Sequence, residues 1–260
     1  MIKLSPNTRF SSHIAQGSLS ARYKTTENLN RKVFQRMLKL YEKKDLCSIS
    51  VIKNNYNDIL PEKKNIQITQ LPLKDYNNCG AGTDVEESKG CITGYSIELP
   101  TDKKKKFNIS DLSSFMHEST HILDYLLNPK YIANYRQMCI RKIYDKKYFT
   151  LYETYFENPR SMFNSDKKQI LASAEIETRR KLKKIRSEEK LIFLNFIKYS
   201  LEMEYHAYSQ DITYAKLLQK LGKPIEKESL FDYNQYMAYP EKIEIINKLI
   251  KEEIDKNRLK

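Results

Sequence analysis

Apolar residues repeat at helical spacing from Ser110 to Leu127, near the middle of the 260-residue chain. Side chains three or four positions apart form one face of this segment, as a half-buried helix requires: Leu112, Phe115, Met116, Leu123, Leu126 and Leu127. Ser110 is suited to cap the helix, and Asp111 adds negative charge where the helix dipole favours it. Asn128 precedes Pro129 and is therefore pushed out of the α region. The pattern predicts a helix over Ser110–Leu127.

One amphipathic helix and several short strands are expected before this segment. Residues Asn28–Lys44 have apolar side chains at helical spacing. Cys47–Ile52, Ile66–Leu71 and Cys91–Leu99 are short apolar runs bounded by Asn, Pro or Gly, which is typical of strands. Asp75–Gly90 is rich in glycine and polar residues. We expect it to be a loop that could act as a flap or contact a substrate.

After Pro129 the pattern is almost wholly helical. Helical stretches are expected at Tyr131–Tyr144, Tyr148–Phe163 with a break at Pro159, Gln169–Lys184, Glu188–Leu221 and Glu241–Asn257, the third and fourth forming either one long helix or two consecutive ones. Without an internal repeat or a clear linker, residues 27–260 are expected to form one domain. We predict a predominantly helical α+β fold, with a small N-terminal antiparallel or mixed sheet in 27–128 and a helical lobe in 129–260.

The chain is strongly basic, with 46 Lys and Arg against 33 Asp and Glu and a formal net charge of +13. Such a charge attracts acidic proteins, anionic membranes or nucleic acid. Nucleic acid is not favoured, because no helix-turn-helix, zinc-finger or RNA-binding signature accompanies the basic clusters. No apolar run is long enough for a transmembrane helix. The four cysteines are scattered without C-x-x-C spacing, which indicates free thiols in a reducing compartment.

The first 26 residues differ in composition from the rest. Met1–Thr26 is rich in serine and threonine, and the first acidic residue is Glu27. The segment lacks the hydrophobic core of a secretory signal peptide. We expect it to be disordered, and it resembles the leader of bacterial proteins that are injected into host cells. This composition predicts secretion without a hydrophobic signal peptide, into the host cytosol; the alternatives are a transit peptide, or a disordered tail on a protein of the bacterial cytoplasm.

Candidate chemistry lies within the Ser110–Leu127 helix, in the run His117-Glu118-Ser119-Thr120-His121. Residues four apart share a helix face, so His117 and His121 can bind one metal ion. This H-E-x-x-H spacing is that of zinc hydrolases, in which the glutamate acts as the general base. The alternatives are a solvent-facing helix or two packed core histidines. Asp124 lies close to the same side, where it could orient a ligand imidazole or be a surface carboxylate.

A catalytic zinc site needs a third protein ligand. We expect it in the helical stretch around residues 201–211, where Glu204, Tyr208 and Asp211 share one face and Ala207 allows close helix packing. The residues alone leave several candidates open: Glu175, Glu177, Glu202, Glu204, His206 and Asp211.

These two segments together resemble a known family. H-E-x-x-H followed by a helical E-[FY]-x-A-D is the pattern of one branch of the glutamate-type zincin metallopeptidases, and Glu204-Tyr205-His206-Ala207-Tyr208 matches the second part except at its last position. The resemblance implies His117, His121 and Glu204 as zinc ligands and Glu118 as the base. Glu204 is thus the first choice for the third ligand, followed by Glu202, and then by His206 or Asp211. Because Tyr208 stands where the family has Asp, Asp211 or Asp124 is expected to support the ligands instead. In zinc peptidases an antiparallel edge strand runs above the active-site helix, and Cys91–Leu99 is expected to be that strand.

The expected function is a zinc metalloprotease that hydrolyses peptide bonds of a protein substrate, as a bacterial effector acting on a host protein. Zinc would polarise the carbonyl, and Glu118 would transfer the proton of water to the leaving amine. Tyr208 is the expected hydrogen-bond donor to the oxyanion, with Tyr205 as the other choice. The alternative is a catalytically inactive zincin-like basic protein that binds an acidic protein, a membrane surface or nucleic acid.

Overall fold

The computed structural model describes residues 13–43, 49–60, 66–71, 81–88, 91–100, 109–127, 167–222 and 230–258. The elements in chain order are α1 (His13–Glu42), α2 (Ile49–Asn57), β1 (Gln67–Leu71), β2 (Gly82–Ser88), β3 (Cys91–Pro100), α3 (Ile109–Leu127), α6 (Lys167–Leu182), α7 (Ser187–Lys220) and α8 (Leu230–Arg258). Helices dominate and the sheet is small, which confirms the predominantly helical α+β fold. None of the described helices is both long and apolar enough to cross a membrane.

The sheet has three strands in the order β1-β3-β2. Strand β1 pairs with β3 in parallel, and β2 pairs with β3 antiparallel, with a bulge between Glu86 and Glu87. The strands expected at Ile66–Leu71 and Cys91–Leu99 are therefore confirmed as β1 and β3. The expectation that Cys91–Leu99 is an edge strand is wrong, because β3 has a neighbour on each side.

Two short segments differ from their predicted structure. Residues 49–52 of the expected strand Cys47–Ile52 belong to α2, in which Ile52 and Tyr56 are buried one helical turn apart. The helix is favoured because its single buried stripe packs into the core, whereas the β-branched run suggested a strand. The expected loop Asp75–Gly90 contains β2, a strand made largely of polar residues that pairs only with β3 among the described strands.

Helices at the two ends are longer than expected. Helix α1 begins at His13, so the disorder expected for residues 1–26 is wrong for 13–26, and residues 1–12 lie outside the described part. Helix α8 begins at Leu230 rather than Glu241 and contains Pro240. The third and fourth helical stretches are two consecutive helices, α6 and α7, joined by a short turn. The helices expected at Tyr131–Tyr144 and Tyr148–Phe163 lie outside the described residues.

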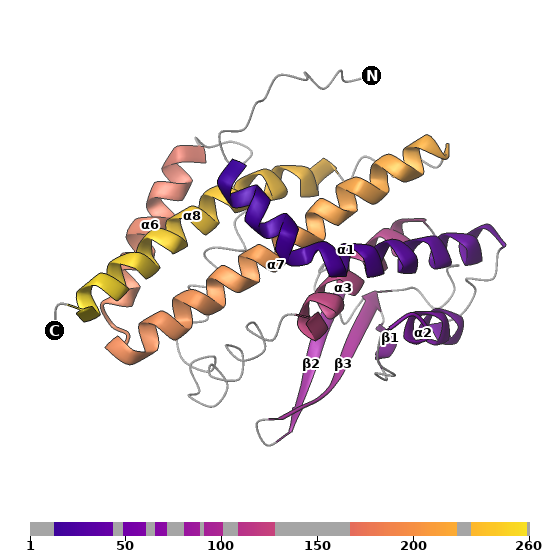
Figure 1. The fold of residues 1–260 in the computed structure, drawn as a ribbon, viewed down its shortest axis with the longest axis horizontal. Helices are drawn as coiled ribbons and strands as arrows, with labels where there is room; N and C mark the ends of the chain where they lie inside the picture. The colour runs from indigo at the N-terminus through magenta and orange to yellow at the C-terminus, as the bar shows by residue number, and fades with distance from the viewer. Residues whose placement is uncertain are drawn as a thin grey trace.

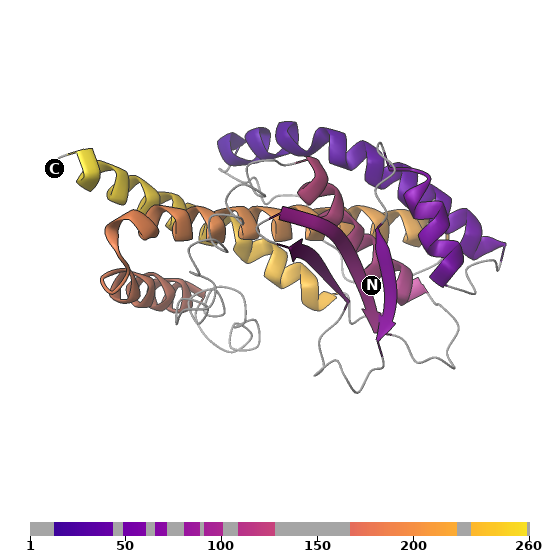
Figure 2. The same cartoon turned by 90° about the horizontal axis from the view of Figure 1, so that it is seen from below.

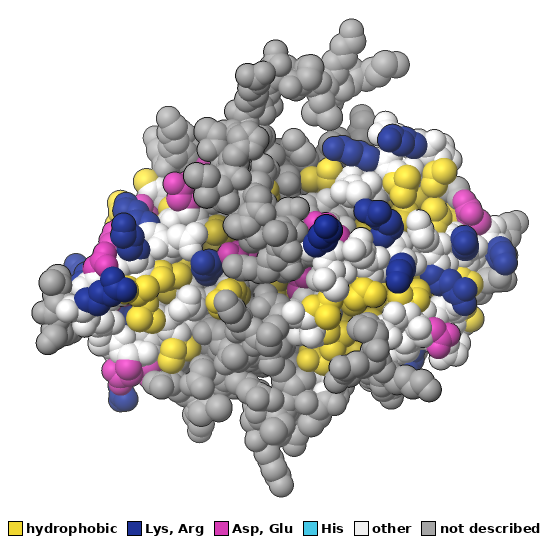
Figure 3. All heavy atoms as spheres, in the orientation of Figure 1, with side chains coloured by type: hydrophobic (Ala, Val, Ile, Leu, Met, Phe, Trp, Pro, Cys, Tyr) yellow, Lys and Arg dark blue, Asp and Glu magenta, His cyan; other side chains and the backbone are white. Residues whose placement is uncertain are grey.

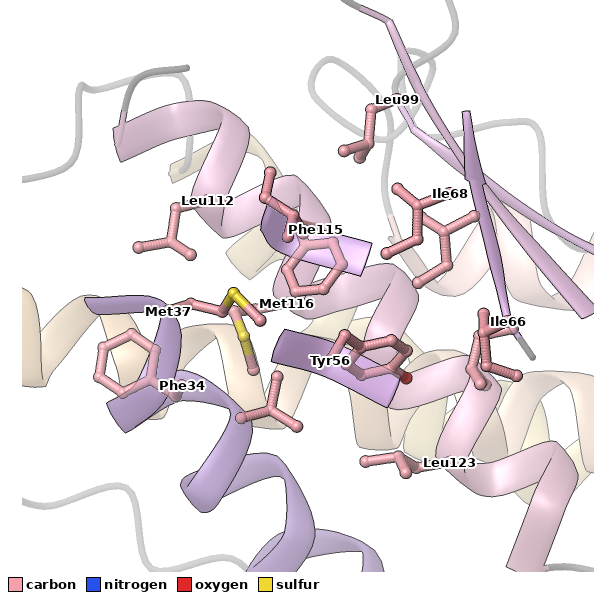
Figure 4. Packing of buried hydrophobic residues seen from close by; sticks show 14 of the residues in the cluster. Phe34, Met37, Tyr56, Ile66, Ile68, Leu99, Leu112, Phe115, Met116 and Leu123 are labelled. Carbon is pink, nitrogen blue, oxygen red and sulfur yellow. The ribbon is translucent and has the colours of Figure 1, made fainter. Parts of the chain in front are cut away.

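A first hydrophobic core joins the sheet to α1, α2, α3 and the C-terminal part of α7 (Figure 4). Its centre is aromatic: the Tyr56 ring meets Phe115 edge to face at 5.4 Å, and Phe34 stacks on Tyr214 at 4.5 Å. Such ring pairs add to the free energy gained by burying apolar area. In Figure 2 the strands lie across α3, and α1 lies along another side of that helix. Helix α3 is thus the central element of the first core.

A second core is formed by α6, α7 and α8. Its most buried residues include Phe193, Leu194, Ile246 and Leu249. Helices α7 and α8 run side by side in opposite directions (Figure 1). Helix α7 is common to both cores: residues up to Tyr205 pack in the second core, whereas Tyr214 and Leu218 pack in the first. Residues 200–211 therefore lie where the two cores meet.

Candidate metal centre

Helix α3 brings the two predicted histidine ligands together. The Nε2 atoms of His117 and His121 lie 3.2 Å apart, and the rings meet edge to face. His121 is 6 % exposed, and His117 is partly buried at the pocket wall. The prediction that both imidazoles share one side of a helix is confirmed.

Helix α7 supplies Glu204, the carboxylate that was expected first as the third ligand. Oε2 of Glu204 lies 3.6 Å from Nε2 of His117, and Oε1 lies 3.5 Å from Nε2 of His121. A tetrahedral ion with bonds of about 2.0–2.1 Å separates its ligand atoms by about 3.3–3.4 Å. The separation of the two Nε2 atoms, and that of each Nε2 from its nearer Glu204 oxygen, are close to this value. His117, His121 and Glu204 therefore form a group that could hold a metal ion.

Asp211 fixes the orientation of one of these imidazoles. Its Oδ2 lies 2.7 Å from Nδ1 of His117. When Nδ1 donates its proton to this carboxylate, the lone pair of Nε2 faces the carboxylate of Glu204 and the second imidazole. Asp211 stands about one helical turn beyond Tyr208. It is one of the two residues that were expected from the sequence to support the ligands, and it contacts His117.

The charges around the group favour a bound cation. Burial lowers the pKa of His117, but the carboxylates of Asp211, Glu204 and Glu118 raise it further, so that it lies well above its ordinary value. Burial raises the pKa of Glu204, yet His121 and His117 hold it well below the usual carboxyl range. A site that stabilises positive charge on its imidazoles in this way also suits a metal cation.

Glu118 is buried beside the ligands without joining the metal-binding group. Its side chain is 7 % exposed, and it lines the same pocket as His117 and His121. Burial raises its pKa, while the two neighbouring imidazoles lower it. A carboxyl group with a raised pKa is suited to accept and return a proton near neutral pH.

A pocket of about 500 Å³ opens in front of these residues. Tyr208 lines it, with its ring 4.8 Å from that of His117 and stacked on Tyr239 at 5.7 Å. Tyr205, the other expected oxyanion donor, is instead packed in the second core. Of the two tyrosines, only Tyr208 is therefore placed to meet a molecule in the pocket.

The other candidates for the third ligand are engaged elsewhere. Glu202 is 4 % exposed, and its Oε1 lies 3.9 Å from Nζ of Lys198. Nδ1 of His206 lies 2.9 Å from Oδ2 of Asp124. Asp124 itself is fully buried. Asp124 is therefore not a surface carboxylate, and the imidazole that it contacts lies outside the group that could hold a metal ion.

Further residues of the pocket wall come from the region of β2 and from the helices, and those on the helices were not anticipated. The start of β2 contributes Ala81, Gly82 and Thr83, and the helices add Ser113, Ser114, Tyr125, Ser200 and Met203. Ser113 and Ser114 precede His117 and Glu118 by one helical turn, and Ser200 precedes Glu204 by one, so helical spacing carried a signal for them. Residues 81–83 belong to Asp75–Gly90, the segment that was expected from the sequence to be a flap or to contact a substrate. They line the pocket, although β2 is a strand rather than a loop.

The side of α3 away from the pocket is held by a buried polar network. Nδ2 of Asn30 donates to Oγ1 of Thr120 at 2.9 Å, and Oγ of Ser119 donates to the Tyr56 hydroxyl at 3.3 Å. All four residues are buried. Satisfied polar groups in a low-dielectric core permit few other arrangements. The network therefore ties α3 to α1 and α2 on the side away from the pocket.

Comparison of the chain with protein-family models, curated proteins and solved structures finds no match.

Proposed function

We propose that this protein is a zinc-dependent hydrolase of peptide bonds. The observation that carries the proposal is the convergence of two imidazoles and one carboxylate on a pocket that also holds a buried glutamate. His117, His121 and Glu204 are a two-nitrogen, one-oxygen donor set, which is the set of many catalytic zinc sites. Three protein ligands leave a further position open, as catalytic sites require.

The proposed chemical role of each residue follows from the position of its side chain. Zinc, when bound, lowers the pKa of a water molecule and polarises a carbonyl group. Glu118 accepts a proton as the oxygen of water bonds to the carbonyl carbon. It then passes that proton to the nitrogen as the carbon–nitrogen bond breaks. Tyr208 donates a hydrogen bond to the oxygen on which negative charge develops, and Asp211 keeps His117 oriented.

The proposed substrate is a protein, cleaved at a segment that enters the pocket beside the start of β2. The proposed setting is a bacterial effector that acts on a host protein. This setting is supported by the serine- and threonine-rich composition of residues 1–26, part of which is helical in α1, and by the scattered cysteines, which are typical of a reducing compartment.

A second candidate function is a basic binding protein that uses the same fold without catalysis. It is favoured by the net charge of +13 and by the Lys and Arg side chains spread over the face in Figure 3. The exposed Lys and Arg residues of α1 include Lys24, Arg31, Lys32 and Lys39. Both functions are compatible with a bound metal, so metal content does not separate them.

The Glu118→Gln variant separates them. We expect purified wild-type protein to contain one zinc per chain, and the variant to keep it because Glu118 is not among the three ligands. Proteolysis should fall by about 10²–10⁴-fold, since a general base contributes that much. Activity is measured as new protein N-termini in a lysate, by mass spectrometry. Glu188→Gln, an exposed position at the start of α7, is the matched control. Undiminished cleavage by Glu118→Gln would refute Glu118 as the general base. Wild-type protein that contains zinc but generates no new N-termini would refute the hydrolase and leave the binding function.

A further inference from the structure

A second polar contact joins α3 to α7 outside the group of possible metal ligands. Nδ1 of His206 lies 2.9 Å from Oδ2 and 3.2 Å from Oδ1 of Asp124. Asp124 is 0 % exposed and His206 is 4 % exposed. The contact is therefore more deeply buried than the one between His117 and Asp211. Neither residue is used in the proposed reaction.

On α7, the residues that contact His117 and His121 and the residue that contacts Asp124 lie on opposite sides of the row of side chains that packs against α3. Side chains on a helix turn by about 100° per residue. Met203, Ala207 and Gln210 form the row of α7 between Glu204 on one side and His206 on the other, and all three are buried. Ala207, which is 0 % exposed, lets α3 and α7 approach closely. Glu204 and Asp211 meet the histidines of α3 on one side of this row, and His206 meets Asp124 on the other.

Contacts on both sides restrict how one helix can roll over the other. A roll of α7 toward the pocket would shorten the contacts of Glu204 and lengthen that of His206, and a roll the other way would do the opposite. Separating Asp124 from His206 would leave a buried carboxylate without this partner, which is strongly unfavourable. Packing around Ala207 alone fixes the distance between the helices but not this rotation.

We propose that Asp124 and His206 are positioning residues, which set the rotation of α7 on α3 and so hold Glu204 within ligand distance of His117 and His121. The inference rests on the proposed metal site. It assigns to this pair no contact with metal or substrate. Its consequence is that metal affinity and ligand geometry depend on a contact on the far side of the helix crossing.

Cobalt(II) binding tests the proposal, because the visible absorption of bound cobalt reports the geometry of its ligands. Asp124→Ala/His206→Phe replaces the pair by apolar side chains of similar total volume, which a core tolerates best. We expect a changed cobalt spectrum and zinc affinity lowered about tenfold, the lower end of the effect of residues that support metal ligands. Zinc affinity is measured by competition with a chromophoric chelator. His206→Asn is the conservative variant, since its amide nitrogen occupies the place of Nδ1, and it should keep the wild-type spectrum.

Thr120→Val is the matched structural control. It breaks the buried contact of α3 with Asn30 of α1 and leaves the contact with α7 intact. We expect it to lower the melting temperature without changing the cobalt spectrum. If Asp124→Ala/His206→Phe does not fold, His206→Gln takes its place, because it moves the donor atom to the position of Nε2.

The outcomes separate this proposal from the proposed function. An unchanged cobalt spectrum and zinc affinity in Asp124→Ala/His206→Phe, or in His206→Gln where that variant replaces it, would overturn the positioning role and leave the hydrolase standing. Equal spectral changes in Thr120→Val would also overturn it, since any loss of core stability would then suffice. Wild-type protein that binds no cobalt or zinc would refute the metal site itself.

Discussion

The two cores differ in how they hold their helices. In the first core α3 is tied by buried polar contacts, such as that between Asn30 and Thr120, as well as by aromatic packing. In the second core aliphatic and aromatic side chains pack together, and the helices that form it also bury Thr178, Glu189 and Glu253. Its most extensive ionic contacts lie at the rim, where Arg179 bridges Glu175 and Glu252 while about a third exposed. The first core specifies the orientation of a helix, whereas the second chiefly supplies a place for α7 to pack.

The candidate centre combines elements of both. The imidazoles belong to α3, at the centre of the first core, while Glu204 lies on α7 next to residues that pack in the second. The separations between Glu204 and the two imidazoles therefore depend on how the two cores are joined. Helix α7 connects the two cores as one continuous helix. Its two halves cannot rotate independently without breaking backbone hydrogen bonds.

The largest expected effect on stability comes from truncating one buried phenylalanine side chain in each core. Phe115 is 0 % exposed and Phe193 is 1 % exposed. Phe115→Ala and Phe193→Ala should each lower the free energy of unfolding by about 3–5 kcal/mol, through lost burial and the cavity left behind. Because α7 passes through both cores, we expect a single unfolding transition in each variant. Far-ultraviolet circular dichroism and tyrosine fluorescence in urea measure it, since the chain has 19 tyrosines and no tryptophan. Two separate transitions would show that the cores unfold independently.

Asp211→Ala is expected to have a smaller effect, which is confined to the candidate metal centre where the two cores meet. Loss of the partner at Nδ1 frees the ring of His117 to turn, so zinc affinity should fall by about 10–100-fold. The free energy of unfolding of the metal-free protein should change much less than in the phenylalanine variants. Zinc affinity is measured by competition with a chelator. Asp255→Ala, at an exposed position near the end of α8, removes the same charge elsewhere. An equal loss of affinity in that control would attribute the effect to net charge alone.

The smallest expected effect lies at the edge of the second core, at Lys242. Burial lowers the pKa of Lys242 to about 8, and its Nζ lies 5.4 Å from the centre of the Tyr239 ring. Below pH 8 the folded protein holds a partly buried charge that the unfolded chain exposes to water. Lys242→Met should therefore stabilise the protein by about 1–2 kcal/mol at pH 7.

The pH dependence of this gain has a definite sign. Between pH 8 and the ordinary lysine value of about 10.5, the unfolded chain keeps the proton that the folded protein has lost. Stability of the wild-type protein should therefore gain a contribution as pH rises through this window, and the advantage of Lys242→Met should shrink. Urea unfolding at pH 7, 9 and 10 measures the difference. Lys251→Met, at an exposed position on the same helix, should show neither effect.

The helices that carry the site were predictable because their patterns are local. Ser110–Leu127 matches α3 to within one residue, and the expected Glu188–Leu221 matches α7 equally closely. The short elements were harder. Ile49 and Val51 suggest a strand by their β-branched side chains, and only the later burial of Tyr56 shows the helical stripe. Strand β2 was missed because Asp84, Glu86 and Glu87 have low strand propensity, and pairing with β3 outweighs it.

The choice of Glu204 rested on helical spacing and on the resemblance, and the structure places it beside both imidazoles. The partner of Asp124 could not be found in the same way. Its position on α3, three residues after His121, suggests a contact with a ligand, and helical spacing supports that reading. Which imidazole it meets depends on the rotation of α7 across α3, which is a property of tertiary packing and leaves no periodic signal in either segment.

The spacing of the donor atoms has a consequence for the folding of the whole chain. An ion held by His117, His121 and Glu204 would join two positions roughly 90 residues apart, and so act as a removable cross-link. A disulfide that closes a loop of this size restricts the unfolded chain by the equivalent of about 4–5 kcal/mol. Chelation would then lower the free energy of unfolding, and so weaken even described elements that touch neither the pocket nor the ion.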